Sequence, residues 1–100
     1  GYAYLDVFNP RSAYRRTADL SIYVDRACRR GGVGQKLYTQ IERLGRERGI
    51  ENFISIITSE NEGSLRFHRK NGFTEVGVMH AVAFKFGKYL DVSFFQKRLG

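Results

Sequence analysis

The stretch "CRRGGVGQKL", Cys28–Leu37, places three glycines directly before a helical pattern. Glycine inside regular structure costs roughly 0.5–1 kcal/mol relative to alanine, so this run needs a reason. The first N–H groups of a helix have no partner within the helix, and the dipole adds about half a positive charge there. Gly31, Gly32 and Gly34 leave room for an anion to approach these groups. The stretch predicts an anion site, and a plain flexible turn is the alternative.

The flanking patterns predict the fold. Strands are expected at residues 2–8, 18–24, 52–58, 74–79 and 89–99, and helices at 33–44 and 64–71. The first helix has an apolar face of Val33, Leu37, Tyr38, Ile41 and Leu44, and Gly49 lies just past its end. "NFISIIT" reads as a central strand that is buried on both faces. The order β-β-α-β-α-β-β requires at least one parallel pairing, so we expect one α/β (α+β) domain over residues 1–100 with a mixed sheet and antiparallel flanks.

Composition narrows the class of protein. The chain is 42% hydrophobic and 27% charged, as in globular proteins, and no apolar run approaches the roughly 20 residues that span a bilayer. Its single cysteine, Cys28, rules out an internal disulfide and fits a reducing compartment. The net charge of +7 favours a polyanionic partner such as nucleic acid or a phosphorylated cofactor, or simply solubility.

The glycine run fits neither of two common nucleotide motifs. It lacks the Lys-Ser or Lys-Thr pair of a P-loop, and it does not read G-x-G-x-x-G. It does read R-x-x-G-x-G, with Arg29, Gly32 and Gly34 at the fixed positions.

With this motif, the chain resembles the acetyl-CoA-binding part of a GNAT-superfamily N-acetyltransferase. The resemblance extends over "LSIYVDRACRRGGVGQKLYTQI" and "SENEGSLRFHRKNGF", and "PRSAYRRTAD" and "FKFGKYLDVSFFQKRL" resemble the phosphinothricin acetyltransferase subgroup. It implies a cytoplasmic enzyme without a metal, which acetylates a small amino-acid-like amine of the phosphinothricin or methionine sulfoximine type. It also implies that the chain begins at the third strand of the family fold and lacks the N-terminal part.

The resemblance assigns three groups of residues. Backbone groups from Arg30 to Gln35 would hold the CoA pyrophosphate, and strand residues would pair with the pantetheine arm. The expected cofactor-binding set is Ile22, Tyr23, Val24, Arg29, Arg30, Gly31, Gly32, Val33, Gly34, Gln35, Asn61 and Ser64. Asn61 is equally suited to capping a helix. Arg11, Tyr14 and Arg15 lie in the loop that would face the substrate.

Acetylation of an amine requires two proton movements. Asp19 stands where the subgroup has a glutamate that is proposed as the base, and its shorter side chain favours a relay through water. His68 is the expected acid for the departing thiolate, with a structural histidine as the alternative.

Two other functions stay open at this point. The chain could be an inactive CoA-binding fragment. It could also be a basic module in which nucleic-acid bases stack on aromatic side chains, which make up 14% of the residues. The second is less favoured because the aromatic residues occupy core-like strand positions, so no nucleic-acid partner is expected, and no membrane partner. The open edge of the first strand predicts a homodimer.

Overall fold

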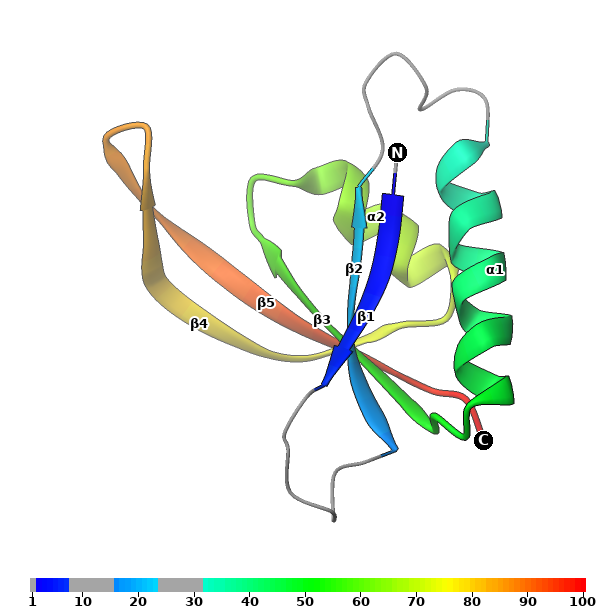
Figure 1. Ribbon diagram of the computed structural model, residues 1–100. Coiled ribbons are helices and arrows are strands. Elements are labelled where there is room, and N and C mark those ends of the chain that lie inside the picture. The colour runs from blue at the N-terminus through cyan, green and yellow to red at the C-terminus, as the bar shows by residue number, and fades with distance from the viewer. Residues whose placement is uncertain (1, 8–15, 24–31) are drawn as a thin grey trace. The chain divides into compact units, whose positions relative to one another are not determined.

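The computed structural model describes residues 2–7, 16–23 and 32–100 (Figure 1). Its elements are β1 (Tyr2–Val7), β2 (Thr17–Tyr23), α1 (Val33–Glu47), β3 (Asn52–Thr58), α2 (Glu62–Lys70), β4 (Thr74–Lys85) and β5 (Lys88–Arg98). This order along the chain, β-β-α-β-α-β-β, is the predicted one. The strands form a mixed sheet in the order β1-β2-β3-β5-β4, which confirms the predicted fold class. The chain divides into two compact units, one of residues 1–53 with 98–100 and one of residues 54–97.

In the first unit, α1 packs against an antiparallel pair of strands (Figure 1). The β1–β2 ladder runs from the pair Tyr2–Tyr23 to the pair Val7–Ala18. Helix α1 also approaches β3 closely at Gly45, where an added Cβ would lie 2.8 Å from Cζ of Phe53 on that strand. Phe53 is fully buried, so glycine is the residue that fits this position.

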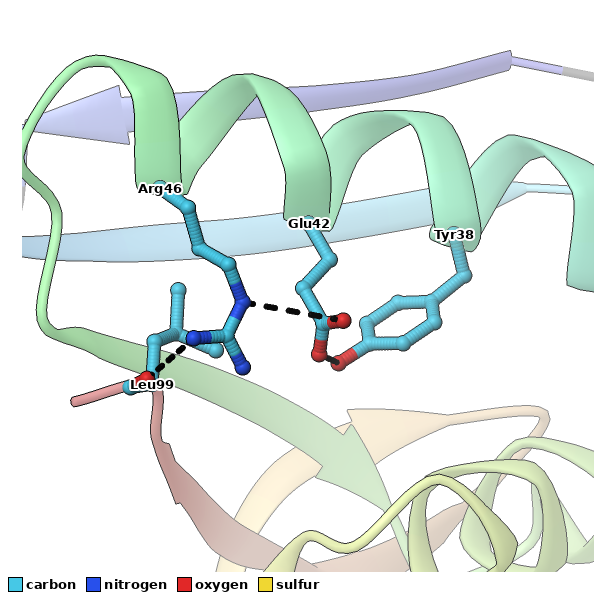
Figure 2. Close-up of polar contacts among 4 residues, drawn as sticks. All are labelled: Tyr38, Glu42, Arg46 and Leu99. Atoms are coloured by element: carbon cyan, nitrogen blue, oxygen red, sulfur yellow. Dashed lines mark hydrogen bonds and ion pairs between the residues drawn. The ribbon is translucent and has the colours of Figure 1, made fainter.

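A series of polar contacts along α1 connects the helix to Leu99, next to the C-terminal residue, in the same unit (Figure 2). The buried Tyr38 donates its hydroxyl proton to Glu42 Oε1 at 2.8 Å. The Nε atom of Arg46 lies 3.9 Å from Glu42 Oε2. The same guanidinium group donates a hydrogen bond from Nη1 to the carbonyl oxygen of Leu99. Burial, then the bond to Glu42, raises the pKa of Tyr38, so the tyrosine remains a donor.

The predicted apolar face of this helix is partly confirmed. Tyr38 is 2% exposed, but Leu44 is 36% exposed. The buried positions are Tyr38 and Gly45, which are seven residues apart and therefore lie on one stripe of the helix. Leu44 lies next to this buried stripe, which explains why its side chain is partly exposed. The expected glycine after the helix is confirmed, because Gly49 has a φ of +79°.

In the second unit, β4 and β5 form an antiparallel hairpin from the pair Thr74–Gln96 to the pair Lys85–Lys88 (Figure 1). Phe86 and Gly87 form its turn, with φ of 53° and 76°. Positive φ at both central residues is typical of a two-residue turn that continues the twist of the strands. The predicted strand over 74–79 was therefore too short, since β4 continues to Lys85.

The prediction that β3 is buried on both faces was wrong. Phe53, Ser55 and Ile57 are buried, but Ile56 is 60% exposed. The alternation is that of a strand with one covered face. An apolar run does not require burial, because apolar side chains also contribute much of a normal protein surface.

Candidate functional site

The start of α1 has the features of an anion site within the described residues. Gly32 precedes the helix with φ +71°, a left-handed conformation that side chains rarely adopt. No described side chain caps the helix there, and no acidic residue lies in its first turn. An added Cβ on Gly32 would have nothing within 4 Å, so the glycine serves backbone conformation and not packing. Backbone N–H groups of Val33 and Gly34 therefore begin a helix without a competing carboxylate.

The residues before Gly32 that were expected to complete this site lie outside the described ranges. These are the predicted cofactor contacts Val24, Arg29, Arg30 and Gly31 and the predicted substrate contacts Arg11, Tyr14 and Arg15. Their roles stay predictions. The described cofactor candidates of the first unit are Ile22 and Tyr23 at the end of β2 and Gly32, Val33, Gly34 and Gln35 at the start of α1.

Asp19 lies on β2 directly opposite Asp6 of β1. Its side chain is half-buried, and its Oδ1 atom is buried with no hydrogen-bond partner among the described residues. Burial, and secondarily the charge of Asp6, raise the pKa of Asp19. A carboxyl group with a raised pKa holds a proton more firmly, which suits a general base better than an ordinary surface carboxylate.

Three predicted residues come together in the second unit. Asn61 caps α2, and its Oδ1 accepts a hydrogen bond from the Ser64 backbone N–H at 3.1 Å. The Ser64 carbonyl oxygen in turn lies 2.8 Å from Nδ1 of His68, and the Ser64 hydroxyl oxygen lies 3.3 Å from the same nitrogen. The helix-cap alternative for Asn61 is thus present in the structure. It does not exclude a second role for the asparagine.

The His68 imidazole is buried, with 3% exposure, among the rings of Phe67, Phe73 and Phe95. A carbonyl oxygen can only accept, so Nδ1 carries the proton that it shares with Ser64. In the neutral ring Nε2 is then an acceptor, and it lies 3.1 Å from the hydroxyl oxygen of the buried Ser55. Burial lowers the pKa of His68, against the smaller opposite effect of the Ser64 carbonyl, and favours this neutral form.

Sequence reasoning missed two residues of these clusters, Ser55 and Asp6. Ser55 is the one hydroxyl in the middle of the apolar run "NFISIIT", and such an interruption of a buried strand predicts a polar partner. Asp6 could be identified only from the register that places it opposite Asp19.

Two features are absent from the described residues, a membrane-spanning helix and a cluster of metal-binding side chains. None of the described helices combines the length and the apolar character that crossing a bilayer requires. The same residues hold no group of three or more His, Cys, Asp or Glu side chains that could bind a metal ion.

Comparison with known proteins agrees with this geometry. Residues 1–94 match the acetyltransferase (GNAT) domain family. The chain is 37% identical to the phosphinothricin N-acetyltransferase of Alcaligenes faecalis, with 99% of this chain and 51% of that protein covered. It is 34% identical to the L-methionine sulfoximine/L-methionine sulfone acetyltransferase of Salmonella typhimurium, with 99% and 58% covered. The chain thus spans about half the length of these curated relatives.

Solved structures give the same assignment. One is the GNAT-superfamily phosphinothricin acetyltransferase from Sinorhizobium meliloti in complex with AcCoA, with a TM-score of 0.90 and 35% identity. The similarity covers 98% of this chain and 53% of that one. The family match over nearly the whole chain, together with the uncapped, glycine-led start of α1, establishes that this chain belongs to the GNAT acetyltransferase family.

Proposed function

We propose that this protein transfers the acetyl group of acetyl-CoA to the amine of a small amino-acid-like substrate of the phosphinothricin or methionine sulfoximine type. The observation that carries the proposal is the start of α1, where Gly32 opens the helix without a capping side chain or an acidic first turn. The names of the relatives support the substrate class. We place the activity in the cytoplasm, which the single cysteine favours.

The CoA pyrophosphate would be held by backbone N–H groups from Arg30 to Gln35, with Arg29 adding charge. Of this set, Gly32 to Gln35 are described, and the helix start fits an anion for the reasons above. Ile22, Tyr23 and Val24 would pair with the pantetheine arm, as would Asn61 and Ser64. Arg11, Tyr14 and Arg15 would contact the amino-acid substrate, since an arginine pairs well with a carboxylate.

Asp19 would take the proton that the substrate ammonium must lose before its nitrogen can attack the thioester. Its raised pKa supports this role. His68 would supply a proton to the departing thiolate. In the neutral ring described above Nε2 has no proton to give, so the donor would be the imidazolium form. The lowered pKa makes that form a stronger acid but also a rarer one.

Calorimetric titration with acetyl-CoA tests the binding site. Gly32→Asp and Gly34→Asp should weaken binding, because each places a carboxylate where the pyrophosphate is expected. Gly49→Asp is a matched control, since Gly49 also has positive φ and open space around an added Cβ but follows the end of the helix. Equal affinity in all four proteins would rule out the site.

Turnover with phosphinothricin and with L-methionine sulfoximine, followed by release of the CoA thiol, tests the reaction. If the acid role holds, His68→Phe should lower turnover by about 10²-fold or more and leave acetyl-CoA affinity unchanged. Acetyl-CoA binding without turnover in the wild type would instead favour the inactive CoA-binding alternative, which agrees with a chain that spans about half the length of its relatives.

We also propose that two copies associate through the apolar end of the β4–β5 hairpin. The arm surface is defined as Val82, Phe84, Phe86 and Tyr89, which are 50%, 66%, 83% and 69% exposed. Phe84 and Tyr89 are cross-strand neighbours with ring centroids 5.0 Å apart. An exposed pair of aromatic rings, with two further exposed apolar residues near it in the sequence, is unusual for a free surface and favours an interaction site.

Charge along β4 supports a second copy as the partner. The acidic Glu75 and the basic Lys85 lie near opposite ends of the strand, and apolar residues predominate between them. Each has a partner within the chain, Arg69 at 3.7 Å from Glu75 and Glu60 at 3.5 Å from Lys85, so a contact between copies would share or replace these ion pairs. When two such hairpins meet antiparallel about a two-fold axis, the Glu75 end of each copy faces the Lys85 end of the other. The proposed surface differs from the edge of the first strand that the sequence suggested, because the described exposed apolar side chains are concentrated on β4 and β5.

A further inference from the structure

Two carboxylates face each other across the β1–β2 ladder. Asp6 and Asp19 are a directly opposed pair, and Leu5 and Leu20 are the neighbouring pair. Because side chains alternate along a strand, the two aspartates share the face opposite to that of the buried Leu20. The β-carbons of directly opposed residues lie about 4.5–5.5 Å apart, so the carboxyl groups are close neighbours.

This pairing is unfavourable for folding. Like charges directly opposite in an antiparallel pair are destabilising. Asp19 is also half-buried, and its Oδ1 atom has no described hydrogen-bond partner, so its charge lacks the usual compensation. The chain has 17 Lys and Arg against 10 Asp and Glu, so composition alone would favour a basic residue opposite Asp19. Conflicts of this kind between local chemistry and stability are expected mainly at functional or strained sites.

We propose that Asp6 is a positioning residue for amine acetylation, and that its negative charge across the ladder keeps Asp19 ready to accept the proton of the substrate ammonium. In this step an N–H bond of the ammonium breaks, directly or through a water, and the proton forms an O–H bond on Asp19. The electron pair stays on nitrogen, which can then attack the thioester. This inference rests on the proposed function, in which Asp19 is the base.

The charges around Asp19 single out Asp6. Burial is the larger cause of the raised Asp19 pKa, and Asp6 is the only described group whose charge adds to it. The neighbouring strand β3 carries no ionisable side chain. Helix α1 packs against β1 and β2, and its ionisable residues are Lys36, Tyr38, Glu42, Arg43, Arg46 and Glu47. None of these changes the pKa of Asp19 by its charge.

The deciding experiment is an NMR titration of the Asp19 side-chain carboxyl carbon. Asp6→Asn should lower the pKa of Asp19, whereas Asp6→Glu, which keeps the charge, should leave it raised. Glu47→Gln is the control for loss of one carboxylate, since Glu47 is exposed on α1 of the same unit. An unchanged Asp19 pKa in Asp6→Asn would overturn the inference whatever the activity of the protein.

The pH profile of kcat/KM gives a second readout that a merely structural role would not move. The acidic limb for acetylation should shift to lower pH in Asp6→Asn, with acetyl-CoA affinity unchanged and with restoration in Asp6→Glu. If the Asp19 pKa falls while the limb stays in place, Asp19 is not the base and the inference is overturned. Absence of turnover in the wild type would count against the proposed function, while the titration would still decide whether Asp6 controls Asp19.

Discussion

The Nε2 atom of His68 lies 3.1 Å from the hydroxyl oxygen of Ser55, and this bond joins α2 to β3 inside the second unit. The other ring nitrogen is held by the Ser64 carbonyl oxygen of the same helix. Both nitrogens of a buried imidazole are thereby satisfied, which fixes its tautomer and its orientation. Any chemical role of His68 must start from this arrangement.

The first prediction concerns the pH dependence of stability. His68 has a lowered pKa in the folded state and an ordinary pKa of 6.5 when unfolded. Below pH 6.5 His68 therefore binds a proton in the unfolded chain but stays neutral in the folded chain until a lower pH. The free energy of unfolding consequently falls as the pH falls through this range. Urea unfolding of the wild type and of His68→Phe, compared across this range, should show that the variant lacks this part of the slope. Parallel curves for the two proteins would contradict the prediction.

The second prediction concerns Ser55. Ser55→Ala removes the hydroxyl that donates to Nε2 and leaves a buried acceptor without that partner, so the free energy of unfolding should fall by about 1–3 kcal/mol. Ser59→Ala is the control, because Ser59 is exposed beyond the end of β3. A loss no larger in Ser55→Ala than in the control would show that the bond contributes little.

A third prediction uses two glycines. Gly45→Ala would place Cβ 2.8 Å from a ring carbon of the fully buried Phe53. Overpacking of this kind costs about 1–3 kcal/mol, more than the roughly 0.5–1 kcal/mol that alanine gains in a helix. Gly77→Ala should instead be neutral or slightly stabilising, since an added Cβ there meets nothing within 4 Å. Thermal unfolding of both variants checks the contrast, which equal melting temperatures would refute.

The fourth prediction concerns Asp19. Because its pKa is raised in the folded state, ionisation of Asp19 costs stability as the pH rises above the unfolded value of 3.8 and through the folded value. Asp19→Asn should therefore be more stable than the wild type at neutral pH, because it removes a charge that burial disfavours and, secondarily, the like-charged pair with Asp6. Loss of the cross-strand pair alone is expected to contribute about 0.2–1 kcal/mol. The difference should disappear below pH 3.8 in chemical denaturation. A variant that is less stable at neutral pH would mean that the carboxylate has a stabilising contact.

The sequence predicted the order of elements because each element carries its own local signal. The glycines at 32, 49 and 72 mark helix boundaries, and all three adopt positive φ in the structure. The hairpin was predicted less well. Phe86-Gly87 is a weak turn signal, because a phenylalanine with positive φ is unusual and is favoured here by the strands that it joins.

The candidate site was predictable only in part, because its contacts depend on pairings between distant segments. The resemblance identified His68, but its bond to Ser55 links residues 13 positions apart on a helix and a strand. Likewise Asp19 was identified by its place in a motif, but Asp6 became relevant only through the β1–β2 register. Local patterns give the elements, and tertiary contacts give the partners of each functional group.

The last prediction concerns the arm surface. Sedimentation over a range of concentrations should show a dimer for the wild type and a monomer for Phe84→Ser with Tyr89→Ser, because these two rings are the largest paired apolar group there. Ile56→Ser is the control, since Ile56 is 60% exposed but lies on β3. Glu75→Lys should weaken the dimer, and the added Lys85→Glu should restore it, because the exchange re-creates opposite charges at facing ends of the two hairpins. A monomeric wild type at high concentration would rule out the dimer, and failure of the charge exchange to restore association would rule out the antiparallel arrangement.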